Sequence, residues 1–320
     1  MIIIDGKKAA KKIENTLREE LKEIPFKPSL HTILLGEDPA SIKYVNMKKK
    51  ACESLGMTSE IHQLPYNTSE TKLIYLINSL NENKKVNGIL VQLPLPNQID
   101  NKIIDMIDTY KDVDGLNQTN TAKLYKWTKN TNNNQTEMEI KPFRNIIPGS
   151  KITRIINPLD EFILEPCTPR GIIDLLDYYN INTTSKNVTI IGRSNIVGKP
   201  LATMLSNNQY NTTVTLCHSK TNNLNYHTQN ADILISAVGK PRFVTSDMIK
   251  EGAVVIDVGT STLEGKLVGD VDFENVKEKT SYITPVPGGV GPMTIINLMR
   301  NTIKAAKIQY YIDNMPKSAY

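Results

Sequence analysis

The segment VTIIGRSNIVGKPL, residues 188–201, constrains the fold of this chain more than any other. It begins with β-branched apolar residues, which are typical of a buried parallel strand, and Gly192 ends that run. Gly198 then opens a stretch whose apolar residues recur at helical spacing. A strand, a glycine turn and a helix form the first unit of a fold that binds a dinucleotide pyrophosphate at the helix N-terminus. Because Ser194 replaces the second glycine of the usual motif, an ordinary strand-turn-helix without a ligand remains an alternative.

Residues 213–221, TVTLCHSKT, add a second indication of nucleotide binding. They read as the next strand, followed by His218, Ser219 and Lys220. A site selective for NAD would carry Asp or Glu there to bind the ribose 2′-hydroxyl. Here that carboxylate is missing, and Arg193 in the first turn is available to pair with a 2′-phosphate, so the residue types favour NADP. The alternative is that Arg193 and Lys220 are solvated surface charges.

Length and composition narrow the class of protein. A chain of 320 residues is long enough for about two domains. With 39% hydrophobic and 22% charged residues, and no apolar run near the ~20 residues of a membrane span, we expect a globular protein without a membrane partner. The net charge of +5 is too small to predict nucleic-acid binding. The cysteines, Cys52, Cys167 and Cys217, are too scattered for a disulfide scaffold or a zinc site, so we expect no metal. The N-terminus enters the folded pattern without a signal sequence, which favours a cytoplasmic location.

Strand and helix patterns alternate along the first part of the chain, which predicts an α/β fold with a parallel sheet between helices. The expected strands are 2–4, 29–35, 57–64 and 88–93, and the expected helices are 7–23, 41–55, 71–83 and 99–107. The pattern is lost between 112 and 166, where the tract NTNNNQ, 130–135, predicts a surface loop.

Order returns in the second part of the chain. Thr168 is expected to cap a helix that runs to about residue 179. Strands are expected near Val188, Val214, Ile233 and Val254, and a final helix at 293–312. We therefore predict two α/β domains with a cleft between them. The first comprises 1–165 plus 293–320, with an asparagine-rich insertion at about 125–165, and the second is a Rossmann-type NADP-binding domain at 166–292.

Several polar residues stand out against this framework. Tyr44 and Lys48 are four residues apart on one expected helix and so share a face, although such a pair is usually at the surface. Gln92 is a polar residue in an apolar strand, and a buried amide must be satisfied by the backbone or by a ligand. Asp114 lies in the segment DVDG, for which a simple turn is the alternative interpretation.

Together these segments resemble the bifunctional methylenetetrahydrofolate dehydrogenase/methenyltetrahydrofolate cyclohydrolase (FolD) family. The resemblance spans nearly the whole chain and follows the family's order. Its motifs are DPASIKYVNMKKKACESLGM (38–57), GILVQLPLP (88–96), KDVDGLN (111–117), PCTPRGI (166–172), IIGRSNIVGKPL (190–201), TVTLCHSKT (213–221), ADILISAVGKP (231–241), VVIDVGT (254–260) and TPVPGGVGPMT (284–294).

The resemblance implies two reactions. Methylenetetrahydrofolate loses a hydride to NADP⁺, and water then opens the resulting 5,10-methenyl compound to 10-formyltetrahydrofolate. Lys48 matches the family's lysine in the second step, where a lysine acts as a base only if its pKa is lowered. Gln92 matches the glutamine that orients this lysine, Tyr44 the tyrosine that packs on the folate, and Asp114 the carboxylate that binds the pterin.

The resemblance also implies the binding residues. Substrate contacts fall on Tyr44, Val91, Gln92, Leu93, Asp114, Pro287, Gly288, Gly289 and Val290. Cofactor contacts fall on Gly192, Arg193, Ser194, Val197, Gly198, His218, Ser219, Ala237, Val238, Gly239, Gly259 and Thr260. The chain departs from the family pattern in the longer segment before PCTPRG, in Ala122 and Lys123, and in Thr260-Ser261, where an Asn often lies near the nicotinamide.

The resemblance further implies a homodimer formed through the nucleotide-binding domain. The strand at 214–217 is expected at a sheet edge, and exposed edges are usually paired or covered. Three other functions are weighed against the bifunctional enzyme: a dehydrogenase with a single activity, an enzyme similar to shikimate dehydrogenase, and an NADP-binding protein without catalysis. Lys48 with Gln92 and the DVDG segment argues against the first two, and the presence of Tyr44, Lys48, Gln92 and Asp114 argues against the third.

Overall fold

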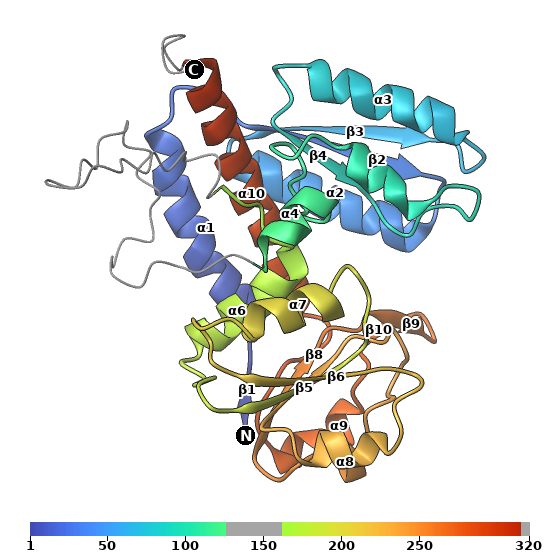
Figure 1. The fold of residues 1–320 in the computed structure, drawn as a ribbon, viewed down its shortest axis with the longest axis vertical. Helices are drawn as coiled ribbons and strands as arrows, with labels where there is room; N and C mark the ends of the chain where they lie inside the picture. The colour runs from blue at the N-terminus through green and yellow to red at the C-terminus, as the bar shows by residue number, and fades with distance from the viewer. Residues whose placement is uncertain (126–161, 315–320) are drawn as a thin grey trace, which may run out of the picture.

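The computed structural model describes residues 1–125 and 162–314. The asparagine-rich tract 130–135 and most of the expected insertion lie outside the described residues. Two parallel sheets with helices on their faces make up the fold, which confirms the predicted α/β class (Figure 1). Within the described ranges no helix is long and apolar enough to cross a membrane.

The smaller sheet has three parallel strands in the order β3-β2-β4. The strands are β2 (Ser29–Leu35), β3 (Thr58–Leu64) and β4 (Gly88–Val91). All residues of β2 are buried because α2 (Pro39–Ser54) and α3 (Glu70–Glu82) cover opposite faces of the sheet (Figure 1). Two short helices follow β4: the 3₁₀ helix η1 (Asn101–Met106) and α4 (Gln118–Lys123). The smaller sheet lies above the larger one in Figure 1, and β3 points sideways, to the right.

The larger sheet has six strands in the order β1-β11-β8-β7-β5-β6, and all of its pairs are parallel. Its strands are β1 (Ile2–Ile3), β5 (Asn187–Ile191), β6 (Thr213–Cys217), β7 (Ile233–Ser236), β8 (Ala253–Asp257) and β11 (Thr280–Ile283). From β5 the chain first moves outward to β6 and then crosses back to β7. This reversal creates a topological switch point between β5 and β7, where open α/β sheets bind their ligands.

The remaining elements of this unit are short. They are the helices α7 (Gly198–Leu205), α8 (Leu224–Gln229) and α9 (Phe273–Val276), the 3₁₀ helices η2 (Ser246–Met248) and η3 (Lys277–Lys279), and an antiparallel hairpin of β9 (Ser261–Leu263) and β10 (Lys266–Val268).

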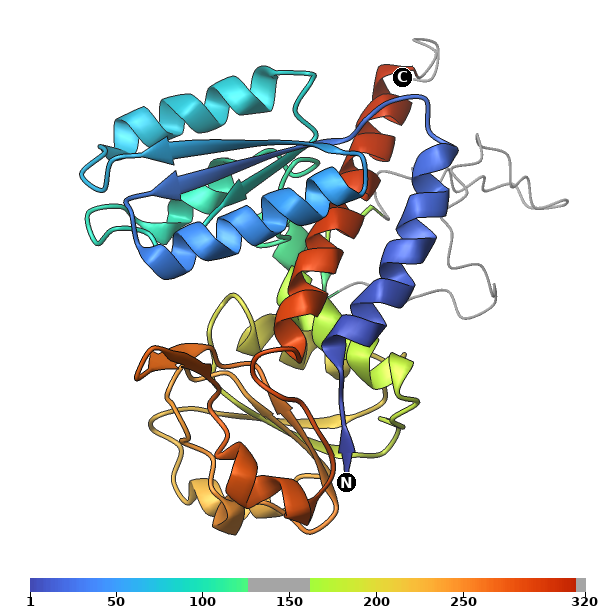
Figure 2. The same ribbon diagram turned by 180° about the vertical axis from the view of Figure 1, so that it is seen from behind.

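Three helices join the two sheets. They are α1 (Gly6–Lys22), α6 (Cys167–Tyr178) and α10 (Val290–Asp313), and α10 packs against the other two (Figure 2). A buried charge cluster fixes the contact between α6 and α10. In it, Asp174 of α6 accepts hydrogen bonds from Arg170 at 2.7 Å and from Arg300 of α10 at 2.8 Å. Asn297 of α10 donates to the same carboxylate at 2.9 Å. Burial alone would raise the pKa of Asp174, but the two guanidinium groups outweigh it and hold that pKa below its usual range.

Several boundaries differ from the sequence prediction. Helix α6 begins at Cys167 after Pro166, and Thr168 is not its cap; the Thr168 hydroxyl instead lies 3.0 Å from that of Thr294. Strand β4 ends at Val91, so Gln92 follows the strand rather than lying within it. Helix α10 begins at Val290, three residues earlier than expected. Helix α4, strand β11 and the β9–β10 hairpin were not predicted, and β1 joins the larger sheet through β11.

Candidate active site

A cavity of about 400 Å³ is lined by residues at the carboxyl end of β4 in the smaller sheet and by residues that follow β5 and β8 in the larger one. Its wall combines helix α2, the end of β4, the turn after β5, the loop after β8 and the first turns of α10. The sequence-predicted residues that line it are Tyr44, Lys48, Val91, Gln92, Leu93, Asp114, Val197, Thr260 and Val290. Sequence reasoning missed a further set that also lines it: Asp38, Ala40, Ser41, Leu90, Pro94, Thr168, Ile196, Val258, Gly291, Thr294 and Leu298.

Lys48 is the central polar group of this cavity. Asp38 caps α2 by accepting a hydrogen bond from the backbone N–H of Ser41 at 2.7 Å, and the helix then presents Tyr44 and Lys48 on one face. The Lys48 side chain is buried, and its Nζ donates to Gln92 Oε1 at 2.8 Å. Its Nζ also lies 5.3 Å from the centre of the Tyr44 ring. The predicted pairing of helix and strand end therefore exists in the structure.

Gln92 is held so that its carbonyl oxygen faces the lysine. Its Nε2 donates to the backbone carbonyl of Leu93 at 2.8 Å, which leaves Oε1 for Lys48. Both ends of the amide are thus satisfied, as a poorly exposed amide requires. An amide oxygen accepts a hydrogen bond without supplying a negative charge, so Gln92 orients the lysine without forming an ion pair with it.

Burial controls the ionisation of the groups beside the lysine. It lowers the pKa of Lys48, an effect that the nearby Asp114 carboxylate partly opposes. It raises the pKa of Asp114, opposed by Lys48, and raises the pKa of Tyr44, helped by the Asp114 charge. A lysine with a lowered pKa beside a carboxylate is the arrangement expected of a proton-transfer site.

The position of Asp114 is fixed by its neighbours in the chain. The buried Asp112 carboxylate accepts hydrogen bonds from the backbone N–H of Asn117 and from Asn120 Nδ2, both at 2.9 Å, and so holds the turn in shape. Burial raises the pKa of Asp112 to about 6. Gly115 has a φ of 69° and packs so closely against the carbonyl of Leu164 that a Cβ would lie 2.5 Å from that oxygen. The DVDG segment is therefore held by hydrogen bonds and close packing that fix Asp114, and it is not a simple turn.

The predicted nucleotide turn has the close approaches that require glycine. A Cβ on Gly198 would lie 1.8 Å from the carbonyl oxygen of Gly192, and a Cβ on Gly192 would lie 2.3 Å from that of Ala237. The Ser194 side chain accepts a hydrogen bond from the Val197 N–H at 3.1 Å, so this serine closes the turn where the usual motif has a glycine. The N–H groups of Val197 and Lys199 are bonded within the turn, to the side chain and the carbonyl of Ser194, both at 3.1 Å. The tight glycine turn at the carboxyl end of β5, next to the switch point of the sheet, fits a dinucleotide.

Two buried carboxylates that the sequence did not single out hold the neighbouring loops. Asp270 accepts hydrogen bonds from the N–H groups of Val238 at 2.7 Å and Lys240 at 2.8 Å. Asp257 accepts from the N–H groups of Gly259 at 3.1 Å and of Asp270 at 2.9 Å. Burial raises the pKa of Asp257 to about 7, although the backbone donors favour its charged form. An aspartate at the end of an apolar strand was the signal that could have identified Asp257.

The comparisons with known proteins agree with this geometry. Residues 4–114 match the family described as tetrahydrofolate dehydrogenase/cyclohydrolase, catalytic domain, and residues 166–310 match its NAD(P)-binding domain. The chain belongs to the tetrahydrofolate dehydrogenase/cyclohydrolase family. The expectations of an enzyme of this family and of an NAD(P) cofactor are confirmed.

Individual members of the family resemble this chain over nearly its whole length. A bifunctional FolD protein of Campylobacter hominis is 49% identical over 312 residues, which cover 96% of this chain and 98% of the relative. A FolD methylenetetrahydrofolate dehydrogenase/cyclohydrolase structure from Campylobacter jejuni has a TM-score of 0.82 at 43% identity, covering 96% of this chain and 99% of that one. The corresponding Trypanosoma brucei enzyme, solved with NADP and an inhibitor, has a TM-score of 0.81 at 34% identity, covering 97% and 98%.

Not all the residues that the family resemblance singled out line the cavity. Pro287, Gly288 and Gly289 lie outside its lining, because the carbonyl of Gly288 accepts a hydrogen bond from the N–H of Gly6 at 2.9 Å and the loop packs against the start of α1. Most cofactor residues of the family pattern lie outside it too, on the loops after β5, β6, β7 and β8 or at the start of α7: Gly192, Arg193, Ser194, Gly198, His218, Ser219, Ala237, Val238, Gly239 and Gly259.

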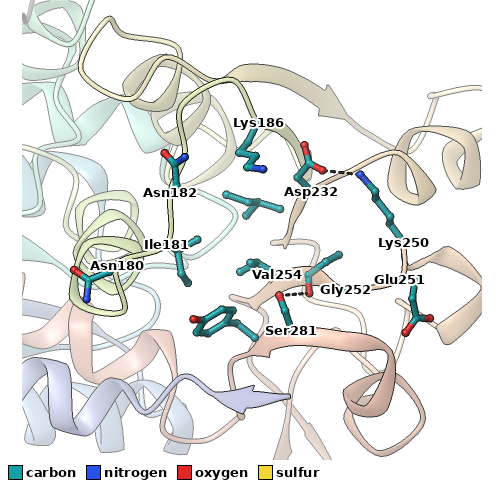
Figure 3. A pocket seen from close by; sticks show the side chains of 13 residues that line it. Asn180, Ile181, Asn182, Lys186, Asp232, Lys250, Glu251, Gly252, Val254 and Ser281 are labelled. Carbon is teal, nitrogen blue, oxygen red and sulfur yellow. Dashed lines mark hydrogen bonds and ion pairs between the residues drawn. The ribbon is translucent and has the colours of Figure 1, made fainter.

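A second hollow lies at the opposite end of the larger sheet (Figure 3). Residues at the amino ends of β7, β8 and β11 line it, and an ion pair of 2.6 Å joins Asp232 and Lys250 across its side. Open α/β sheets of this family's kind bind ligands at the carboxyl ends of their strands. The hollow at the amino ends is therefore not the active site.

Proposed function

We propose that this chain oxidises 5,10-methylenetetrahydrofolate with NADP⁺ and hydrolyses the 5,10-methenyl product to 10-formyltetrahydrofolate, both in the cavity around Lys48. The observation that carries the proposal is the buried Lys48, hydrogen-bonded to Gln92 and next to Tyr44 and Asp114. These side chains come from three separate segments and meet at the cavity that also borders the nucleotide-binding turn.

In the first reaction the protein supplies position more than acid or base. The nitrogen lone pairs of the folate can release a hydride, and the bound dinucleotide accepts it. The Asp114 carboxylate is suited to accept several N–H donors of a pterin, and the ring of Tyr44 is suited to pack on its plane. The two together would hold the reacting carbon at the boundary with the nucleotide-binding loops.

In the second reaction a proton must leave the attacking water. Lys48 in its neutral form accepts that proton, and burial favours the neutral form by lowering its pKa. Gln92 holds the amine in place through the bond of 2.8 Å. The cation formed in the first reaction would lower the pKa of the adjacent lysine further, since like charges disfavour each other.

We propose NADP rather than NAD as the preferred cofactor. Arg193 is exposed in the turn after β5, and Ser219 and Lys220 are exposed after β6, so a cation and a hydroxyl are available to a 2′-phosphate. No carboxylate follows β6 at the place where an NAD-specific site carries one.

We further propose that the protein is a cytoplasmic homodimer. Strand β6 lies at the edge of the six-stranded sheet, and within the described part of the chain no strand pairs with its outer side. A second copy could cover this edge by an isologous contact. The division into 1–165 plus 293–320 and 166–292 is proposed as the boundary of the two domains. Sedimentation at micromolar concentration tests the dimer, because one species near the 35.9 kDa mass of a single chain would contradict it.

The experiment for the two activities follows both products in one cuvette. With 5,10-methylenetetrahydrofolate, NADP⁺ should be reduced, and the methenyl absorbance should rise and then fall as 10-formyltetrahydrofolate forms. A reaction that stops at the methenyl compound would contradict the hydrolytic function, and no reduction of either NADP⁺ or NAD⁺ would contradict the dehydrogenase.

A further inference from the structure

Three side chains of the kinds that bind metal ions meet on one face of the smaller sheet. His31 lies in β2, and Glu60 and His62 lie in the adjacent strand β3. The parallel register pairs His31 with Glu60, and His62 is two residues further along β3. Because alternate residues of a strand point to the same face, all three side chains lie on one side of the sheet. The strand pairing alone therefore brings them together.

Their ligand atoms are close enough to share one ion. His31 Nδ1 and His62 Nε2 are 2.9 Å apart, and Glu60 Oε2 is 3.8 Å from His31 Nδ1. One ligand atom of each residue lies within 4.8 Å of the other two. Two ligands of a tetrahedral zinc ion, each ~2.1 Å from the metal, are ~3.4 Å apart. The observed distances of 2.9 and 3.8 Å lie on either side of this value, so small rotations of the side chains would bring the ligand atoms to it.

The three side chains differ in their exposure to solvent. The side chains of His31 and His62 are 11% and 18% exposed, whereas that of Glu60 is 62% exposed. A neutral imidazole offers a nitrogen lone pair to a metal ion, and the two imidazoles lie side by side with their ring centres 5.1 Å apart. Two imidazoles and one carboxylate leave a fourth position of a tetrahedral ion on the solvent side, where water can occupy it.

Lys111 is a positive charge close enough to act on His31, but it is already engaged. Its Nζ donates hydrogen bonds to the backbone carbonyl oxygens at the end of α3. Those carbonyls belong to Leu80, Asn81 and Asn83, at 3.0, 2.6 and 2.9 Å. The lysine is thus tied to the helix end, while Glu60 supplies a negative charge to the cluster.

We propose that His31, Glu60 and His62 bind one divalent transition-metal ion, with zinc as the ion whose ligand preference fits best. Imidazole and carboxylate ligands suit zinc, whereas magnesium and calcium prefer oxygen ligands alone. His31 lies in the first half of β2, away from the strand ends that border the cavity around Lys48. The ion would link the central strand β2 to the edge strand β3, and it would stabilise the folded chain by mass action.

Calorimetric titration of the full chain with zinc chloride tests this proposal, after any bound metal has been removed with a chelator. The wild-type protein should bind one zinc ion per chain, and zinc should raise its melting temperature. His62→Gln should weaken the binding at least tenfold, and Glu60→Gln should weaken it less because that side chain is exposed. Both substitutions lie on the edge strand. They therefore test the site without replacing the buried His31, whose substitution is the one more disruptive to folding.

The chain offers a matched control because it has four histidines. His227→Gln removes the histidine of α8, outside the cluster, and should leave zinc affinity and stoichiometry unchanged. The proposal is overturned if the wild type binds no zinc. It is equally overturned if His62→Gln and His227→Gln bind zinc with the same affinity, because the ion would then be held by other groups.

Discussion

Lys48→Met should abolish the hydrolysis of 5,10-methenyltetrahydrofolate and reduce the dehydrogenase reaction much less. Among the described residues that line the cavity, Lys48 is the one amine, so no other lysine can take over as base. A positioned general base contributes ~10²–10⁴-fold to a rate, which corresponds to ~3–5 kcal/mol of activation free energy. Hydride transfer depends on the position of the folate and the cofactor, which Tyr44 and Asp114 are proposed to maintain.

The substitution should not unfold the protein. Lys48 is 6% exposed, and its Nζ donates a hydrogen bond to the neutral Gln92, whereas no carboxylate of the described residues 1–125 and 162–314 forms an ion pair with it. Methionine fills a similar volume without a charge to desolvate, and such replacements of buried charges are often neutral or stabilising. Unchanged or increased resistance to urea would therefore separate a catalytic effect from a structural one.

The pH dependence gives a second readout of the same residue. Burial lowers the pKa of Lys48, and only the neutral amine can accept a proton, so hydrolysis should rise with pH through that pKa and be lost below it. The folded chain binds this proton more weakly than the unfolded chain does. The stability of the wild type should therefore rise with pH between the folded and the unfolded pKa of the lysine. Lys48→Met should remove both dependences.

Initial rates of the two reactions, measured separately on the same preparations, check this prediction. Lys50→Met is the matched control, because Lys50 is exposed on the same helix and both rates should stay at the wild-type level. Wild-type hydrolysis in Lys48→Met would refute the role as base. An equal loss of both reactions would show that the lysine only positions the substrate.

Three further substitutions test other parts of the account. Arg193→Ala should weaken NADP⁺ by ~1.5–3 kcal/mol in binding titrations and NAD⁺ much less, since only NADP⁺ carries the 2′-phosphate; equal weakening would contradict that role. Gly198→Ala places a Cβ 1.8 Å from a backbone oxygen and should cost ~1–3 kcal/mol in urea unfolding, and an unchanged midpoint would contradict the observed close approach. Asp174→Ala removes the buried carboxylate to which Arg170, Asn297 and Arg300 all donate, and should cost ~3–5 kcal/mol. The pKa of Asp174 is lower in the folded chain than in the unfolded chain. The stability that Asp174 contributes should therefore be complete above its unfolded pKa and disappear as the pH falls through its folded pKa. If Asp174→Ala has the same dependence of stability on pH as the wild type, this reasoning is refuted.

Much of the fold follows from local sequence patterns. The β-branched run before Gly192, the helix that carries Tyr44 and Lys48, and the edge position of β6 were all predicted correctly. The elements that were missed are short or lack a pattern of their own. Strand β11 has four residues, and the β9–β10 hairpin is mostly exposed, so neither shows the periodicity on which the prediction depends.

The features of the site that the sequence does not predict depend on contacts between segments far apart in the chain. Lys48 and Gln92 are 44 residues apart, so their residue patterns do not reveal the bond of 2.8 Å between them, and only the family resemblance linked the two. The support of the cofactor loops by Asp257 and Asp270 depends on the packing of separate strand ends. The cluster of His31, Glu60 and His62 depends on the register of two strands, which a single sequence does not reveal.

The most direct test of one shared cavity is the inhibition of both reactions by a folate analogue that undergoes neither. If the Lys48 cavity serves the dehydrogenase and the cyclohydrolase alike, the analogue should compete with each folate substrate and give the same inhibition constant for both. Inhibition constants that differ by more than tenfold, or an analogue that blocks only one reaction, would contradict a single site.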